Sequence, residues 1–335
     1  MGTGRWTTSR TAAAGIAVAG VVGLGLLAVP AGAGAAPDLP PVTPEALVAS
    51  VLAADPDAFA GTVELDNSLG LPPLPEVPQA GDGTSTARIW SDGDRGGRVQ
   101  LPTDSGEKTL VSDGTTVWAY DSEGRTVTER THPAGHDAAV PADPTAAATE
   151  AIAVLQTSSV VTVDGTAEVA GRPAYELVLT PAPDERTLLR AVRIAVDAEQ
   201  RIPLRMTVLA TGSSDPVLQV GFTELAFGPQ DPALFTFTAP PGTTVEEPPA
   251  ERPEGVGPPE GVTPSVVGEG WDTVLLATVP TDSGMELRTL GTPVSGAWGS
   301  GTLISTAVAT AILTDDGRVA AGAVPEQVLT EALAR

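Results

Sequence analysis

Residues 59–66 read FAGTVELD, and their alternation decides the fold class. Phe59, Gly61, Val63 and Leu65 are apolar or small, and mostly polar residues stand between them. A period of two predicts a strand with one buried and one solvated face, which is typical of antiparallel sheets. The pattern recurs in Thr115–Asp121, Ala174–Thr180, Arg193–Asp197, Leu204–Val208 and Leu218–Phe222. The chain therefore predicts a mainly antiparallel β protein.

Turn-forming tripeptides separate several of these segments. Ser112–Gly114, Ser122–Gly124 and Val163–Gly165 each end in glycine, which predicts hairpin connections. Asp92-Gly93-Asp94 resembles the start of a calcium loop, but the glutamate that such a loop needs is missing. We therefore expect a tight hairpin turn there.

Two helices are expected among the strands. Thr43-Pro44-Glu45 has the N-cap, proline and early acid of a helix start, and this helix should run to about Asp55. Asp143-Pro144 should open a second helix that continues to about Gln156. Its position between two blocks of strands predicts that it covers one face of the sheet. Its alanine-rich surface buries little apolar area, so we expect it to act as a removable lid.

The two ends of the chain have different compositions. Residues 1–35 combine two arginines, an apolar run and an Ala-Gly-Ala site, which predicts an export signal or an uncleaved N-terminal anchor. Residues 36–247 should form the main domain, and 248–264 a Pro-rich linker. Residues 265–335 should form a small α+β unit that docks on the main domain or on a partner.

This C-terminal unit should contain three strands, a turn and a helix. The strands are expected at 271–279, 285–290 and 303–313, the turn at 315–317 and the helix at 325–334. Trp271 is expected to belong to the small core of the unit. Gly296–Gly301 should form a turn before a strand.

The composition excludes several classes of function. A net charge of -24 repels nucleic acid and anionic membrane surfaces. The absence of cysteine excludes disulfides, thiolate metal sites and a lipid-modified cysteine. His132 and His136 stand in a Pro/Gly-containing loop without a third ligand pattern, so we expect no metal site, no cofactor and no catalytic triad.

Three stretches resemble the LolA family of periplasmic lipoprotein carriers. Leu110–Asp121 is similar to its S-D-G-x-x-x-W-x-Y hairpin, and Asp231–Gly242 is similar to its closing F-x-F-x-x-P-x-G strand. The first helix followed by Phe59–Val63 fits the start of the family. The resemblance spans residues 43–247 and implies an unclosed, curved β half-barrel with a helical lid. RseB-like regulators share this fold, so the resemblance leaves the function open.

The resemblance implies a lipid or an acylated protein as the ligand. Aliphatic side chains should line an apolar cavity on the concave face, which we expect to be hollow enough for an acyl chain. The candidate lining residues are Val63, Leu65, Trp118, Tyr120, Tyr175, Leu177, Leu179, Ile194, Val196, Met206, Val208, Val220 and Phe222. Ordinary core packing is the competing explanation for all of them.

Two functions fit these expectations. The first is an exported carrier without catalytic activity that sequesters acyl chains in the cell envelope. The second is an RseB-like sensor whose C-terminal unit binds a membrane-associated envelope protein.

Overall fold

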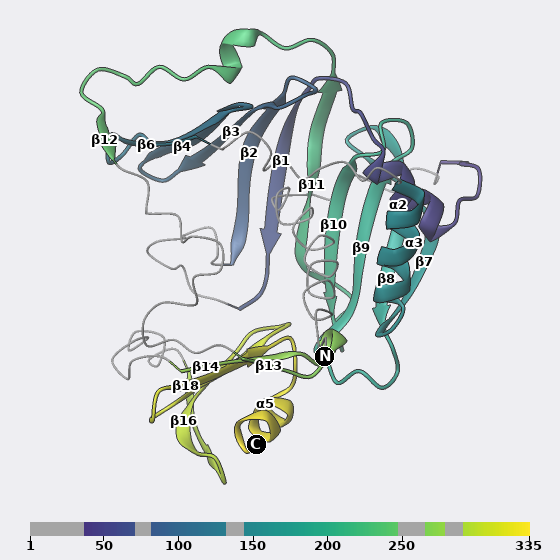
Figure 1. Cartoon of the computed structure of the whole chain (residues 1–335), viewed down its shortest axis with the longest axis vertical. Coiled ribbons are helices and arrows are strands. Elements are labelled where there is room, and N and C mark those ends of the chain that lie inside the picture. Colours follow the sequence, from purple (N-terminus) through teal and green to yellow (C-terminus); the bar gives the residue numbers. More distant parts are fainter. Residues whose placement is uncertain (1–36, 71–81, 132–143, 247–264, 279–290) are drawn as a thin grey trace, which may run out of the picture.

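The computed structural model describes residues 37–70, 82–131, 144–246, 265–278 and 291–335. These residues form a sheet of 12 strands and a second sheet of 6 strands, with three α-helices beside them (Figure 1). The predicted architecture of mainly antiparallel strands is confirmed, and the helices beside the sheets make the fold α+β. The expected export signal, the Pro-rich linker and both histidines lie outside the described residues.

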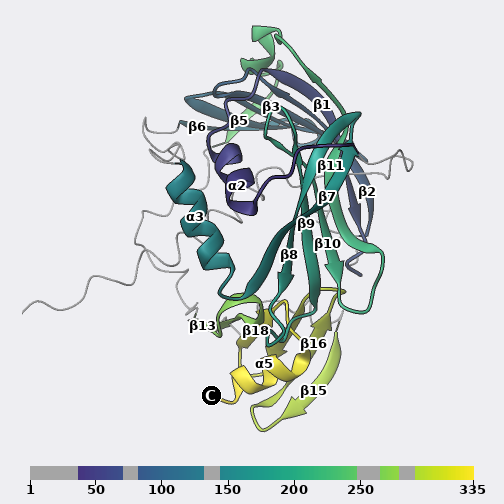
Figure 2. The same cartoon turned by 90° about the vertical axis from the view of Figure 1, so that its right-hand side faces the viewer.

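The larger sheet is unclosed and has the order β12-β6-β5-β4-β3-β2-β1-β11-β10-β9-β8-β7. Neighbouring strands are antiparallel, except that β12 and β6 are parallel. The sheet curves around two helices (Figures 1 and 2). Its strands are β1 (Phe59–Asn67), β2 (Gly83–Ser91), β3 (Gly96–Thr103), β4 (Gly106–Asp113), β5 (Thr116–Asp121), β6 (Thr126–Thr131), β7 (Ser159–Val169), β8 (Arg172–Pro181), β9 (Leu189–Asp197), β10 (Pro203–Ala210), β11 (Pro216–Phe227) and β12 (Thr244–Glu246).

The two helices lie side by side on the same face of this sheet (Figure 2). Helix α2 (Pro44–Leu52) begins after Thr43, whose hydroxyl accepts a hydrogen bond from the amide of Ala46 at 3.2 Å. Helix α3 (Pro144–Leu155) connects β6 to β7. Both helices therefore form where the sequence predicts them, and Asp143 lies outside the described residues.

Two of the three predicted turns are confirmed, and the third is wrong. Strand β7 runs straight through Val163–Gly165, where the pairing with β8 shifts register. Gly165 has a φ of +86°, so its conformational freedom serves a β-bulge and not a hairpin. The β7–β8 turn is made instead by Ala170 and Gly171, both with positive φ.

The predicted closing strand within Asp231–Gly242 is also wrong. Pro232–Phe235 forms a 3₁₀ helix, η2, which is capped by the side chain of Asp231 and followed by irregular chain. In Figure 1 this green segment arches from the end of β11 to β12 at the far edge of the sheet. We call Pro232–Glu246 the strap.

The smaller sheet has the order β13-β14-β18-β17-β16-β15. Helix α5 (Glu326–Leu333) packs on it, and its Leu329 forms a buried core with Val274, Ile312 and Ala320. A 3₁₀ helix, η3 (Gly270–Asp272), precedes β14. The strands are β13 (Ser265–Val267), β14 (Val274–Thr278), β15 (Thr292–Gly296), β16 (Gly299–Ser305), β17 (Thr310–Thr314) and β18 (Arg318–Gly322).

The structure corrects three expectations for this C-terminal unit. The stretch 303–313 is not one strand, because a turn at Thr306–Ala309 divides it into β16 and β17. Trp271 lies in η3 and not in a strand, and Trp298 occupies the core in its place. The third correction is that β13, β15 and β18 were not expected at all. The strand expected at 285–290 lies outside the described residues.

Candidate functional site

The face of the larger sheet that meets α2 and α3 is called the concave face here, and the opposite face the convex face. Residues directly opposite each other in antiparallel strands point to the same side. One such row crosses five strands and contains Leu177, Ile194, Met206, Val220 and Leu65. The row on one side of it contains Tyr175, Val196, Phe222 and Val63. The row on the other side contains Leu179, Val192, Val208 and Leu218. The structure thus brings 11 of the 13 candidate residues onto one face.

The helices cover one half of this face. Leu47 of α2 and Ile152 of α3 are 0% and 1% exposed and share a cluster with Tyr175, Leu177 and Val196. The two helices also pack against each other, so they and the strands share one core.

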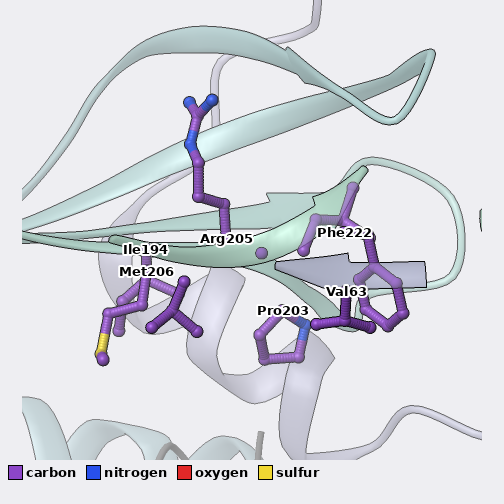
Figure 3. A pocket seen from close by; sticks show the side chains of 9 residues that line it. Val63, Ile194, Pro203, Arg205, Met206 and Phe222 are labelled. Atoms are coloured by element: carbon purple, nitrogen blue, oxygen red, sulfur yellow. The ribbon is translucent and has the colours of Figure 1, made fainter. Parts of the chain in front are cut away.

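A small hollow remains beside the helix-covered half. Val63, Ile194, Pro203, Met206 and Phe222 point to the same side around it, and the neighbouring Arg205 points away (Figure 3). Its volume is about 20 Å³, which is room for roughly one water molecule. Ligand sites usually have about 300 Å³ or more. The expected acyl-sized hollow is therefore not open at this position, and a chain could enter only if the packed groups moved apart.

The segment before α2 is tied to the sheet by two hydrogen bonds. The hydroxyl of Tyr175 donates to the carbonyl oxygen of Pro40 at 3.0 Å, and Thr166 Oγ1 donates to that of Pro37 at 2.7 Å. The guanidinium of Arg201 lies 5.3 Å from the centre of the Tyr175 ring. These contacts hold the entry to α2 against the strands.

Trp118 and Tyr120 do not lie on the concave face, so this part of the site prediction is wrong. The ladder from Val63 through β2, β3 and β4 puts Ala119 on the concave side and its two neighbours on the convex side. There both rings contact Phe237 of the strap, at centroid distances of 6.3 and 5.7 Å. The two rings therefore pack against the strap. A residue of β5 can be covered on either face of the sheet, and here the strap covers the convex one.

The concave face also extends into the first half of the sheet, which was not predicted from the sequence. The same ladder places Ile89, Val99 and Leu110 there, and Leu110 is 48% exposed. The signal was present, because Ala87 and Ile89 alternate with polar or amphipathic residues in β2. The apolar concave face is therefore wider than the helix pair that covers it.

The convex face carries charges that hold the strands in register. Glu176 of β8 accepts hydrogen bonds from Arg193 and Arg205, each at 3.0 Å. At the end of β9, Asp197 is fully buried and paired with Arg172. Burial acts to raise the pKa of Asp197, but hydrogen bonds from Arg172 and two backbone amides bring its pKa below the usual value.

Among the described residues, no group of three or more His, Asp or Glu side chains is placed to hold a metal ion. Nor does any helix in these parts of the chain have the length and hydrophobicity to cross a membrane. The apolar concave face is therefore the candidate binding site.

Comparisons with known proteins found one family and several solved structures to which the chain is similar. Residues 93–238 match the family described as outer membrane lipoprotein carrier protein LolA. No curated protein matches the sequence. The chain is similar to a solved complex of MucA and MucB from Pseudomonas aeruginosa, with 19% identity and a TM-score of 0.45 over 86% of this chain and 94% of that chain.

Two further solved structures are similar over the greater part of their own length. A conserved protein from Thermus thermophilus has 13% identity and a TM-score of 0.37, over 60% of this chain and 95% of that chain. A LolA superfamily protein from Nitrosomonas europaea has 10% identity and a TM-score of 0.26, over 59% of this chain and 99% of that chain. With the family match and the unclosed curved sheet on its helices, the larger unit of this chain has a LolA-like fold.

Proposed function

We propose that this chain is an exported, non-catalytic protein that binds an acyl chain of a lipid or lipoprotein against the concave face, under α2 and α3. The observation that carries the proposal is the set of continuous apolar rows across β8, β9, β10, β11 and β1. A helix pair covers only part of this face. The match of residues 93–238 to a lipoprotein carrier family supports the same ligand class.

The energetics suit reversible binding. Each buried methylene of an acyl chain contributes about 0.8 kcal/mol. Displacing the helices exposes Leu47 and Ile152, which costs about 1.5–3 kcal/mol for each side chain. A chain of about ten methylenes outweighs this cost. The empty protein therefore stays closed, and a loaded protein can release its ligand as the helices return.

A second candidate is a regulatory protein that binds a membrane-associated partner through its C-terminal unit. The specific observation is an exposed apolar pair on neighbouring strands. Val266 of β13 is 65% exposed and lies opposite Leu275 of β14, which is 49% exposed. An exposed apolar patch can mark a protein contact. Extraction of the purified protein followed by mass spectrometry separates the two candidates, because only a carrier should retain acylated molecules.

The binding face can be tested with two matched substitutions. Val208 is a half-buried valine on the concave face of the larger sheet, and Val160 is an exposed valine on its convex face. Val208→Glu should lower the affinity for a fluorescent fatty acid at least tenfold, because a carboxylate next to the acyl chain must be desolvated. Val160→Glu should leave the affinity unchanged within twofold. Equal effects of the two substitutions, or no binding by the unaltered protein, would reject the proposed site.

A further inference from the structure

The C-terminal unit contacts the main sheet at the hinge of helix α3. Three residues, Gln156–Ser158, connect the end of α3 to the start of β7. The indole Nε1 of Trp271 in η3 donates a hydrogen bond to Ser159 Oγ at 2.7 Å. Ser159 is the first residue of β7 and is 5% exposed. In Figure 2 the lower end of α3 points toward the C-terminal unit.

A carboxylate from the β8–β9 loop fixes η3 at this position. Glu185 accepts hydrogen bonds from the backbone amides of Trp271 and Asp272, at 2.9 and 3.0 Å. The same loop is tied to the hinge, because the amide of Ala182 donates to the carbonyl oxygen of Ser158 at 2.8 Å. The loop, the hinge and η3 thus form one hydrogen-bonded cluster, which we call the hinge clamp.

The backbone of η3 approaches the hinge closely at a glycine. A Cβ atom at Gly270 would lie 2.5 Å from both the Ser158 side chain and the Glu185 carboxylate, and the φ of Gly270 is +69°. Any other residue would be strained and would push η3 away from the hinge. The close approach thus depends on this glycine.

Further contacts hold the rest of the unit to the same loop. The amide of Leu188 donates to the carbonyl oxygen of Ala323 at 2.9 Å. Arg186 forms an ion pair with Glu331 of α5 at 2.7 Å. A contact outside the loop also holds the unit, because the amide of Ala307 donates to the carbonyl oxygen of Leu69 at 2.9 Å. The position of the C-terminal unit therefore does not depend on η3 alone, and the hinge clamp can transmit that position to α3.

We propose that the hinge clamp couples the C-terminal unit to α3, so that docking of this unit restrains the opening of the helix. A partner that displaces the unit would then loosen α3. The link to ligand binding rests on the proposed function, in which α3 is the lid. The restraint on α3 can be tested without any ligand.

The test is hydrogen exchange of the α3 amides in the full chain, measured by mass spectrometry. Trp271→Phe keeps most of the ring but removes its N–H, and Ser159→Ala removes the acceptor. Loss of this hydrogen bond should raise exchange in α3 by about 2- to 12-fold in each variant. Gly270→Ala should raise it as well, through the clash with Ser158.

Trp298→Phe is the matched control. Trp298 is 8% exposed in the C-terminal core, and its indole N–H has no hydrogen-bond partner among the residues that the structure describes. This variant should leave exchange in α3 unchanged, even where it raises exchange in β16–β18.

Unchanged α3 exchange in Trp271→Phe and Ser159→Ala would overturn the clamp. An equal rise in Trp298→Phe would also overturn it, since general loosening of the unit would then be the cause. If a clamp variant loses fatty-acid binding while its α3 exchange is unchanged, the result contradicts the hinge clamp alone. If the substitutions raise α3 exchange as expected but the unaltered protein binds no fatty acid, the result contradicts the proposed function alone.

Discussion

Ile152→Ala separates a movable lid from a permanent core helix. Ile152 is 1% exposed and packs in the cluster that joins α3 to β7, β8 and β9. Truncation of a fully buried isoleucine to alanine costs about 2–5 kcal/mol. This cost falls on the closed state. If an acyl chain displaces α3, the loaded state has already lost the Ile152 contacts and is little affected.

The variant should therefore unfold at lower urea concentration and yet bind a fluorescent fatty acid more tightly. A difference of 2 kcal/mol between closed and loaded states corresponds to about a 30-fold gain in affinity, so a gain of tenfold or more is expected. Urea unfolding monitored by circular dichroism and a fatty-acid titration at 25 °C give the two quantities.

Leu209→Ala is the control for loss of stability alone. Leu209 is 6% exposed and belongs to a separate buried cluster with Val178 and Ala191, away from the helices. It should lower stability by a similar amount without any gain in affinity. If Ile152→Ala lowers stability and leaves the affinity unchanged or weaker, α3 is a fixed part of the core and the reasoning fails.

Three other predictions concern single polar contacts. Tyr175→Phe removes the hydrogen bond to Pro40 and should weaken the tie before α2 by about 0.5–1.5 kcal/mol, seen as faster hydrogen exchange in α2. Burial is the main cause of the raised pKa of Glu185, so the folded state binds its proton more tightly than the unfolded chain. Stability should therefore rise as the pH falls through this raised pKa and level off below the ordinary pKa of a glutamate, about 4.3. Urea midpoints measured from pH 7 to about pH 4 should show this gain in the parent protein and not in Glu185→Gln. Asp197→Ala leaves Arg172 without its buried partner and should cost about 3 kcal/mol in urea unfolding at neutral pH. Because the pKa of Asp197 is lowered, its contribution is present above its ordinary pKa of about 3.9 and is lost below it, so the stabilities of variant and parent should converge in acid.

Local patterns in the sequence were sufficient to predict most of the helices and strands of the larger sheet. The alternation in 59–66 and in the later strands predicts the antiparallel sheet, because side chains in a strand point to alternate faces. Thr43 and Pro44 predict the start of α2, because the capping hydrogen bond forms within one turn of chain. Eleven candidate residues share one face for a related reason. Residues paired across neighbouring antiparallel strands point to the same side, so the alternation in each strand lines up with that of the next.

Only the tertiary structure decided what covers each face. The pattern around Trp118 and Tyr120 is compatible with burial on either side of β5, and contact with Phe237, more than a hundred residues later, selects the convex side. Trp271 is an apolar residue that would fit a small core, but a buried acceptor on Ser159 places it at the hinge. The face or contact that such a side chain takes depends on partners that are distant in the chain, so it cannot be predicted from the local alternation of residues. For the same reason the sequence predicts an apolar concave face, whereas the width of this face and the small volume of its hollow, about 20 Å³, follow from how the strands pair and how their side chains pack.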